Sequence, residues 1–442
     1  MHSAVAVDLG ATSARFAAGW FIEDHIDFEI IEQIPHHPIR SGHHQVWDID
    51  LLVAICQRAS RYASECFKNP SIGIDTWGVD IGFLDAKGDL LRPIVAYRDE
   101  SHSHASELLD SVHLYSLTGI QRQPFNTIYQ LYARGIENPG LKQRRWLLLP
   151  DLLGYLLCGK LVCEQTIAST TGLMGLDGHW CKEAFERIGW PVPVIQPSAT
   201  GTVSGPDPNG VSVIRVGGHD TASAVYGMGL EYADQAFLNV GTWSLLGCVV
   251  NEPIVTAEAE EANFTNERAN DGRIRFLVNI PGFYIVNRIH EELGIQVSVP
   301  LWLAERDSGY AEVVDFLDPT LYNPESMISS ISKLLGSRPK TPEQWANLAL
   351  MSLVETTSRQ LEKLQKISGR QFSEIRVAGG GSSSEAFCQA LADRSGKTVL
   401  AGPVEATVLG NLAAQFVTRG VIAPSSVSAV LRRSSELREY RA

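Results

Sequence analysis

The sequence predicts an α/β protein made of two similar domains, and two observations lead to this prediction. The chain has 442 residues, which is more than a single hydrophobic core usually organises. A short pattern also occurs once in each half, where an apolar strand runs into a small turn rich in Gly, Ser and Thr. The two copies cover residues 5–13 and 236–244. We therefore expect one such turn in each of two domains.

Both turns have the composition of a phosphate-binding loop. Gly10 begins an Ala-Thr-Ser turn, and Gly241 begins a Thr-Trp-Ser turn. Backbone N–H groups in such turns point into a concave site that suits phosphate oxygens, and hydroxyl groups add further donors. One turn in each half predicts two domains, at residues 1–228 and 229–442, that grip a polyphosphate from opposite sides of a cleft.

The first half is expected to start with an antiparallel meander of three strands, at residues 4–9, 14–22 and 28–34. Asp50 is placed to cap a helix over residues 51–68, whose apolar residues have helical spacing. Four further expectations follow in chain order: a strand at 72–75, a hairpin pairing 81–85 with 94–97 about Lys87-Gly88-Asp89, helices through 101–160, and a long loop at 190–208. A strand at 211–216 then leads into Gly217-Gly218-His219-Asp220.

The second half starts again with strands, at about 235–240 and 243–250. Thr341, Pro342 and Gln344 have the order of N-cap, first helical residue and capping-box partner, so a helix is expected from there to Ser368, before Gly369. A strand at 375–378, the turn Gly379-Gly380-Gly381 and a helix at 384–395 come next. Such a glycine turn lets a flat ring and its ribose approach the backbone closely. A strand at 398–401 and a helix at 405–419 close the pattern.

Composition excludes several classes of protein. The net charge of −13 argues against nucleic acid as a partner, because that partner needs a basic stripe. No apolar run approaches the ~20 residues of a membrane span, and no signal peptide is evident. Seven scattered cysteines without a CxxC pair indicate reduced thiols and a cytoplasmic protein. The pairs His36-His37 and His43-His44 favour a solvated loop over a metal cluster, because no nearby carboxylate completes a ligand set.

Eight motifs in family order give the chain a strong resemblance to the FGGY carbohydrate kinases, and within that family to the rhamnulokinases. They lie at residues 6–11, 73–80, 95–99, 124–131, 219–225, 241–245, 379–381 and 401–411. The string Asp-Thr-Trp-Gly-Val-Asp at residues 75–80 is specific to this branch. The phosphate turns are shared by the wider group of sugar kinases, hexokinase and actin.

The resemblance implies two ribonuclease-H-like domains of the actin and hexokinase type, with an interdomain cleft. Sugar would bind mainly to the first domain and MgATP mainly to the second. The implied reaction is ATP-dependent phosphorylation of the 1-hydroxyl of L-rhamnulose to L-rhamnulose 1-phosphate, in L-rhamnose catabolism, by a monomer or homodimer. The alternatives are a kinase of another ketose, such as L-fuculose or L-xylulose, and a non-catalytic sugar-sensing relative.

The resemblance also assigns the catalytic base and the metal ligand. Asp220 of the His-Asp-Thr motif would take the proton from the sugar hydroxyl, and its place after a glycine pair at a strand end lets its carboxylate point into a cleft. Asp220 could also cap a helix that starts at Thr221, and both roles can hold together. Asp8 would hold Mg²⁺, with an Asx-turn as the alternative. Asp75 is either a second carboxylate near the metal or a structural acceptor, and Trp77 is either a cleft wall or core.

The remaining site residues are carried over from the same resemblance. The sugar-binding set is Gly78, His219, Asp220, Thr221 and Asn279. The nucleotide-binding set is Ala11, Thr12, Ser13, Ala14, Arg15, Thr242, Asn287, Gly380 and Gly381. Three residues depart from the family pattern: Ala14 replaces a usual Gly, Asn287 a longer Gln, and Ser384 an Asn. The first could tighten the phosphate pocket, and the other two could weaken nucleotide contacts.

Overall fold

The structure is a computed structural model that describes residues 2–109, 114–241 and 243–442. The chain divides into two compact units. The first contains residues 1–229, 250–276 and 407–434, and the second contains residues 230–249, 277–406 and 435–442. The linear division into a sugar domain and a nucleotide domain stays a prediction.

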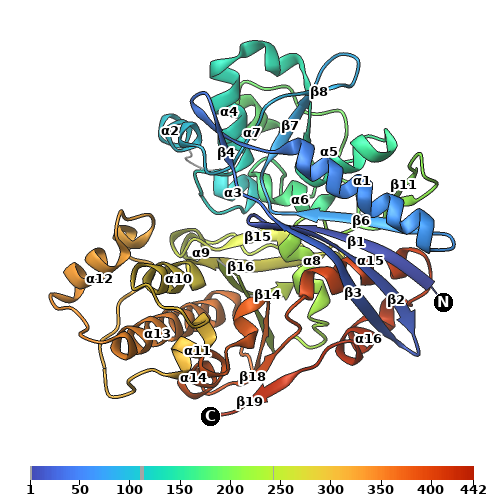
Figure 1. The fold of residues 1–442 in the computed structure, drawn as a ribbon. Coiled ribbons are helices and arrows are strands. Elements are labelled where there is room, and N and C mark those ends of the chain that lie inside the picture. Colours follow the sequence, from blue (N-terminus) through green and yellow to red (C-terminus); the bar gives the residue numbers. More distant parts are fainter. Residues whose placement is uncertain (1, 110–113, 242) are drawn as a thin grey trace. The chain divides into compact units, whose positions relative to one another are not determined.

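The first unit contains a six-stranded sheet in the order β11-β12-β6-β1-β2-β3 (Figure 1). Its strands are β1 (His2–Leu9), β2 (Ser13–Ile22), β3 (His25–Pro35), β6 (Ser71–Thr76), β11 (Thr202–Pro206) and β12 (Ser212–Arg215). β1, β2 and β3 form the predicted antiparallel meander. β6 runs parallel to β1, and β12 runs parallel to β6. The carboxyl ends of β1, β6 and β12 therefore meet at one edge of the sheet.

Successive side chains of β1 point to opposite faces of the sheet, so they pack in two different cores. Val5 and Val7 pack in the core formed with α1 (Ile49–Cys66) and α5 (Leu149–Cys158). Ala4 and Ala6 pack on the other face, in the core formed with α15 (Ala406–Thr418) and α16 (Val427–Arg433). The same alternation places the next even-numbered residue, Asp8, on the α15 face.

A third core of this unit lies among short helices and a small sheet. The helices are α2 (Glu100–Leu108), α3 (Leu114–Thr118), α4 (Thr127–Glu137), α6 (Gln165–Ala168) and α7 (Lys182–Ile188). The sheet has the order β10-β7-β8, with β10 (Arg145–Leu148), β7 (Ile81–Leu84) and β8 (Leu90–Leu91). Another three strands pair as β4 (Ile39–Ser41), β5 (His44–Trp47) and β9 (Ile94–Val95). The unit also contains α8 (Asp220–Gly227), α9 (Ala257–Glu261), β15 (Thr265–Arg268) and the start of β16 (Ile274–Ile280).

Several expectations for the first half are wrong in detail. The cap of α1 is Asp48, whose Oδ1 accepts from Leu51 N at 3.1 Å, so the helix begins before Asp50. The turn at 87–89 exists, but it is so tight that β7 pairs with residues 90–91, and residues 94–95 pair with β5 instead. β10 interrupts the predicted helical region because it pairs with β7, which is distant in the sequence. β11 interrupts the predicted loop because it pairs with β12, the next strand along the chain.

The solvated-loop interpretation of the histidine pairs is also wrong in part. β4 and β5 occupy this segment. His36 is buried, with Nε2 2.7 Å from the Gly10 carbonyl oxygen, and its ring packs against Trp47 and Trp77. His44 contacts Asp99, Nδ1 to Oδ1, at 3.2 Å.

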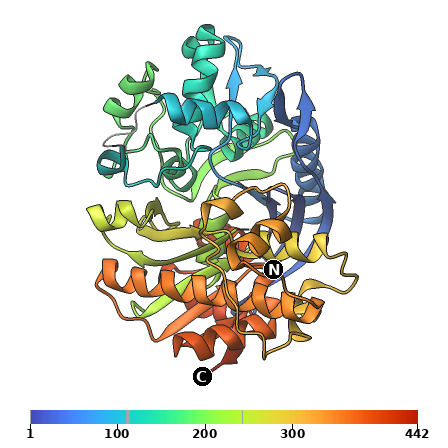
Figure 2. The same ribbon diagram turned by 90° about the vertical axis from the view of Figure 1, so that its left-hand side faces the viewer.

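The second unit repeats the strand order of the first. β13 (Gln235–Val240) is antiparallel to β14 (Ser244–Val250) and parallel to β17 (Glu374–Ala378), which is parallel to β18 (Thr398–Ala401). β19 (Arg438–Tyr440) is antiparallel to β18. The helices are α10 (Gly282–Glu292), α11 (Val299–Ala304), α12 (Met327–Leu335), α13 (Pro342–Ser368) and α14 (Glu385–Ser395). α13 packs against α10, α11 and α14 (Figure 2).

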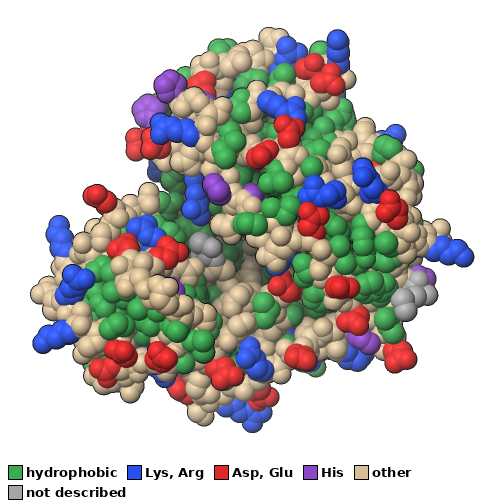
Figure 3. Space-filling model, viewed as in Figure 1, with side chains coloured by type: hydrophobic (Ala, Val, Ile, Leu, Met, Phe, Trp, Pro, Cys, Tyr) green, Lys and Arg blue, Asp and Glu red, His purple; other side chains and the backbone are tan. Residues whose placement is uncertain are grey.

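The long helix α13 starts and ends where the sequence predicts. Thr341 Oγ1 accepts from Gln344 N at 3.3 Å, and the C-cap Gly369 has φ +67°. The Gln344 side chain accepts from Lys340 N at 2.8 Å, one residue before the expected capping-box partner. Among the described side chains on the face shown in Figure 3, lysines and arginines are interspersed with aspartates and glutamates. No helix in the described part of the chain is both long and apolar enough to cross a membrane.

Candidate active site

Two carboxylates meet at the carboxyl ends of β1 and β6. Asp8 and Asp75 are register partners on these parallel strands, so both side chains lie on the α15 face. Arg15 is the partner of Asp8 on β2, and its Nε and Nη2 donate to Asp8 Oδ2 at 2.9 and 2.7 Å. Strand register alone therefore brings two acidic groups and one guanidinium together.

Asp75 is fully buried and only partly satisfied. Its Oδ2 accepts from Asn411 Nδ2 at 2.5 Å, and its Oδ1 has no hydrogen-bond partner among the described residues. Burial raises the pKa of Asp75 well above its usual range, and the nearby charge of Asp8 raises it further. A buried carboxylate oxygen without a partner, beside a second carboxylate, is a suitable place for a hard cation.

These residues fit a magnesium ion that takes most of its ligands from elsewhere. Mg²⁺ is usually held by one or two carboxylates, with waters and phosphate oxygens as the other ligands. Among the described residues, no cluster of three or more His, Cys, Asp or Glu side chains could hold a metal ion without such help. Asp8 and Asp75 are thus compatible with Mg²⁺ bound together with a phosphate.

Asp220 is positioned by the same sheet. β12 leads into Gly217-Gly218, and Thr76 N at the end of β6 donates to Gly218 O at 2.9 Å. Asp220 is the first residue of α8 and His219 is its N-cap, so the expectation that Asp220 caps a helix starting at Thr221 is wrong. Thr221 Oγ1 donates to Asp220 Oδ1 at 3.1 Å. Desolvation is the main reason that the pKa of Asp220 is raised.

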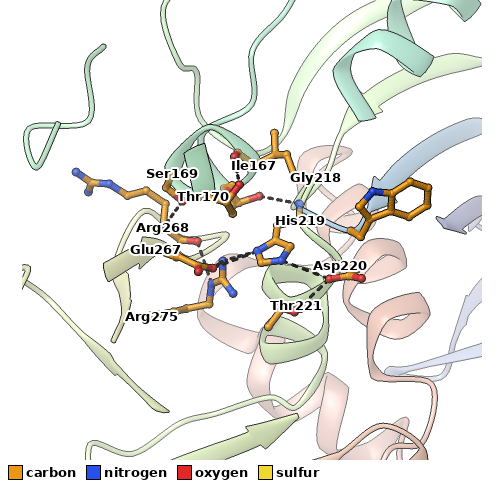
Figure 4. A network of polar contacts seen from close by, with 12 residues as sticks. Ile167, Ser169, Thr170, Gly218, His219, Asp220, Thr221, Glu267, Arg268 and Arg275 are labelled. Atoms are coloured by element: carbon orange, nitrogen blue, oxygen red, sulfur yellow. Dashed lines mark hydrogen bonds and ion pairs between the residues drawn. The ribbon is translucent and has the colours of Figure 1, made fainter. Parts of the chain in front are cut away.

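His219 joins Asp220 to a buried ion pair (Figure 4). Its Nε2 lies 3.5 Å from Asp220 Oδ1, and its Nδ1 lies 3.2 Å from both Glu267 Oε2 and Arg275 Nη2. Arg275 Nη2 donates to Glu267 Oε2 at 3.0 Å, and its side chain is fully buried. Burial raises the pKa of Glu267, but the charge of Arg275 opposes it, and the net result is a lowered pKa, so Glu267 is a carboxylate.

Gly78 lies directly against the His219 ring. A Cβ built on Gly78 would be 3.3 Å from His219 Nε2 and 3.5 Å from Thr170 Oγ1. Any side chain would therefore crowd the ring edge that faces Asp220. The structure thus brings Gly78, His219, Asp220 and Thr221 together in one unit, and their role in sugar binding stays a prediction.

Asp80 organises the aromatic residues beside this group. Its Oδ2 accepts from Trp47 Nε1 at 2.5 Å and from Trp77 Nε1 at 2.8 Å, and its Oδ1 accepts from Gln130 Nε2 at 2.9 Å. Burial raises the pKa of Asp80 to about 6, against these hydrogen bonds. The Trp47 and Trp77 rings pack against each other at a tilt of 39°, with centroids 4.1 Å apart, and Trp77 is only 5% exposed. Trp77 is therefore mainly a core residue whose polar atom fixes Asp80.

The first phosphate turn is closed by a hydrogen bond from Gly10 N to Ser13 O at 2.9 Å. Thr12 is exposed at its tip, and Ala11 and Ser13 are half-buried. Ala14 is fully buried in the core beneath β2, so its methyl group points away from the turn's open side. Any contact between a phosphate and Ala14 would have to come from its backbone.

In the second unit the glycine turn lies against the end of β13. A Cβ on Gly381 would come within 2.2 Å of Val240 Cγ1, and one on Gly379 within 2.7 Å of Val240 O. Gly380 is exposed, with open space around the Cβ position. The second predicted phosphate turn, at Gly241, follows β13 directly, so it is a neighbour of the glycine turn at 379–381, which follows the adjacent strand β17. Thr242, predicted to bind the nucleotide, lies outside the described residues.

The other predicted contacts of this unit are more dispersed. Asn279 is half-buried near the end of β16, and Asn287 is half-buried on α10. Ser384 caps α14, with Oγ accepting from Phe387 N at 3.4 Å, so the departure at this position has a structural use. The roles of Asn279 and Asn287 stay predictions.

The sequence did not predict the residues that hold Asp75 and His219 in place, which are Asn411 for Asp75 and Glu267 with Arg275 for His219. Asn411 lies in one of the family motifs, but the motif by itself predicts no role for it, and no motif marks Glu267 or Arg275. Glu267 and Arg275 lie equally far on either side of Asp271, in a hairpin whose Ala269 N donates to Arg273 O at 2.9 Å. The Asn-Asp-Gly turn is a signal for that hairpin. Nothing in the sequence places the hairpin beside His219.

Comparison with known proteins gives the class of this protein. Residues 3–199 match the N-terminal domain, and residues 236–419 the C-terminal domain, of the FGGY family of carbohydrate kinases. The chain therefore belongs to the FGGY family of carbohydrate kinases.

Its curated relatives are rhamnulokinases. The rhamnulokinase of Bacillus subtilis (strain 168) is 34% identical over 439 residues, covering 93% of this chain and 89% of the relative. The rhamnulokinase of Enterococcus faecalis (strain ATCC 700802 / V583) is 35% identical over 450 residues, covering 94% and 89%.

Solved structures support the fold alone, because their sequences are distant. A ligand-bound xylulose kinase from Lactobacillus acidophilus has a TM-score of 0.82 at 15% identity, covering 100% of this chain and 94% of that one. A Plasmodium falciparum glycerol kinase with ADP has a TM-score of 0.79 at 14% identity, with the same coverage. The prediction of an α/β protein of two ribonuclease-H-like domains is confirmed.

Proposed function

We propose that this protein is an ATP-dependent rhamnulokinase, which transfers the γ-phosphoryl group of MgATP to the 1-hydroxyl of L-rhamnulose. The products are L-rhamnulose 1-phosphate and ADP, in L-rhamnose catabolism. The observation that carries the substrate assignment is the near-full-length identity of 34–35% to proteins named rhamnulokinase. The geometry around Asp220 supports the reaction type.

Asp220 is the general base in this proposal. It takes the proton of the attacking sugar hydroxyl, and a raised pKa makes its carboxylate a better proton acceptor. Thr221 Oγ1 holds Asp220 Oδ1, so the second oxygen, Oδ2, is the one that we assign to the sugar hydroxyl. Gly78 leaves the edge of the His219 ring uncovered by a side chain, and we assign a sugar carbon to this side of the ring.

Phosphoryl transfer mainly requires alignment and charge stabilisation, so the phosphate-facing residues complete the assignment. Asp8 and Asp75 would hold Mg²⁺, which when bound neutralises phosphate charge. Arg15 holds Asp8 in place from β2. The backbone of the turn from Gly10 to Ser13, and the glycine turn of the second unit, would contact the phosphates and the adenosine of ATP.

A panel of ketoses tests this proposal. ADP release should be measured with L-rhamnulose, L-fuculose, L-xylulose and L-ribulose in parallel, with and without Mg²⁺. We expect L-rhamnulose to have the highest kcat/KM. A higher value for another ketose would replace the substrate and keep the kinase. No ADP release with any ketose, from folded protein that still binds sugar, would favour a non-catalytic sugar-sensing relative.

A further inference from the structure

The environment of His219 decides which of its ring nitrogens carries the proton. Nδ1 faces Arg275 Nη2 and Glu267 Oε2, each at 3.2 Å, and Nε2 faces Asp220 Oδ1 at 3.5 Å. Arginine has only donors, and a carboxylate has only acceptors. Arg275 therefore requires a bare Nδ1, whereas Glu267 favours a protonated one. The two neighbours demand opposite tautomers of a neutral ring.

The contacts favour the tautomer that Arg275 requires. With the proton on Nε2, Nδ1 accepts from Arg275 and Nε2 donates towards Asp220, and one acceptor pair, Nδ1 with Glu267, is left in contact. With the proton on Nδ1, Glu267 gains a donor, but Arg275 N–H then faces N–H, and a bare Nε2 faces the Asp220 carboxylate. The first arrangement has two favourable contacts and one unfavourable contact, and the second has the reverse.

Glu267 keeps Arg275 where this arrangement needs it. Arg275 Nη2 donates to Glu267 Oε2 at 3.0 Å, and Arg275 Nε donates to Arg268 O at 3.0 Å. A fully buried guanidinium without a carboxylate would carry a large desolvation cost. Glu267 therefore compensates the charge of Arg275 and fixes the direction of its N–H groups.

We propose that Arg275, held by Glu267, is a positioning residue that fixes the proton of His219 on Nε2, so that the ring presents an N–H donor to Asp220 and to an oxygen of the acceptor sugar. Arg275 itself touches neither. The donor lies at the ring edge that Gly78 leaves open, so it would orient a sugar oxygen and the base together. The role of this donor towards a sugar rests on the proposed kinase function. The location of the His219 proton, which the first test reads, does not depend on that function.

The first test reads the tautomer directly. Protein labelled with ¹⁵N in its histidines is studied by NMR about two pH units above the ordinary histidine pKa of ~6.5. The His219 signals are assigned as those that disappear in His219→Gln. We expect a bare Nδ1 and a protonated Nε2 in the unmodified protein. A proton on Nδ1 overturns the proposal, whatever the protein's activity.

The second test separates positioning from a structural role. Arg275→Lys keeps the charge but loses the planar fork, so we expect kcat/KM for the sugar to fall about tenfold, with the KM for ATP unchanged. In a His219→Gln background, the same change should alter kcat/KM by less than about twofold, because the ring it acts on is gone. An equal loss in both backgrounds would mean that Arg275 supports the fold only, and would overturn the proposal.

Arg268→Lys is the matched control. Arg268 lies on the same strand as Glu267, but its guanidinium donates to Gly272 O and Leu176 O, away from His219 (Figure 4). The Arg268→Lys substitution should leave the NMR signals of His219 unchanged. If Arg275→Lys does not fold, the charge-matched pair Glu267→Gln with Arg275→Met takes its place, and retention of the Nε2 proton in that pair would overturn the proposal. If no ketose is phosphorylated, the kinase proposal fails. The NMR result still decides the separate proposal that Arg275 fixes the proton of His219 on Nε2.

Discussion

Asp8 and Asp75 are register partners on the neighbouring parallel strands β1 and β6, so two carboxylates lie side by side on one face of the sheet, near the edge where these strands end. One is held by Arg15 and the other by Asn411. The arrangement is costly for the isolated protein, because the pKa of Asp75 is raised well above its usual range by burial and by the charge of Asp8. Two neighbouring carboxylates whose ionisation destabilises the fold are suited to a bound cation, which would neutralise their charge.

Asp75→Asn should be more heat-stable and less active than the unmodified protein. The amide carries no charge, and its oxygen can still accept from Asn411. Since a raised pKa in the folded state costs stability as pH rises, the gain should be present at neutral pH, about 2 °C or more in Tm, and should vanish near pH 3. Turnover should fall because a proposed Mg²⁺ ligand is lost.

Thermal unfolding and ADP release check these two effects together. Asp271→Asn is the control, because Asp271 is a more exposed carboxylate, paired with Arg273. A lower Tm in Asp75→Asn, or unchanged turnover, would contradict the assignment.

Asp80→Asn should remove a pH-dependent part of the stability. The pKa of Asp80 is about 6 in the folded state and about 3.9 in an unfolded chain, so its favourable contribution is complete below about pH 4 and is lost as pH rises to about 6. Relative to the variant, the unmodified protein should lose up to about 1.4 kcal/mol per pH unit across that window, and nothing more above it.

Denaturant unfolding followed by tryptophan fluorescence measures this difference, and Trp47 and Trp77 contact the substituted side chain directly. The difference between the two proteins should be constant between about pH 7 and pH 8. A constant difference from pH 4 to pH 8 would show that Asp80 does not titrate in this range.

Asp220→Asn should lose at least ~10²-fold in turnover, the lower end of a general-base contribution, while sugar and ATP still bind. The substitution keeps the size of the side chain and its place at the start of α8. Turnover is measured by ADP release and binding by calorimetry. Near-normal turnover in a folded variant would rule Asp220 out as the base.

Gly241→Val and Gly380→Val should weaken MgATP binding without unfolding the protein. Among the described residues that are not its chain neighbours, Trp243 O is the atom that a Cβ at Gly241 would meet, at 3.5 Å, and Gly380 has open space there, so a Cβ fits at either position without a clash. A loss of ATP affinity therefore reports a ligand that approaches these backbones. Sugar affinity, measured on the same samples, is the internal control, and unchanged ATP affinity would argue against a nucleotide role for either turn.

The resemblance to a known family located most of the residues that the structure brings together around Asp220. Gly78, His219 and Thr221 were predicted from motifs far apart in the sequence, and strand register places them side by side. Local signals did well where the interaction is local, as for the Thr341 cap of α13. They failed for β8 and β10, and they gave the strand at 94–95 the wrong partner, because short strands are defined by their partners and not by their own composition.

The sequence by itself determined the repeated strand and turn, the alternation that puts Asp8 on the α15 face, and the family of the protein. Only the tertiary structure decided that Asn411 holds Asp75, that Asp80 is bound by two tryptophans, and that Glu267 and Arg275 stand behind His219. The physical reason is the range of the interactions. Backbone periodicity and capping act over a few residues, whereas a buried polar group takes its partner from whichever segment the packed core brings within hydrogen-bond distance.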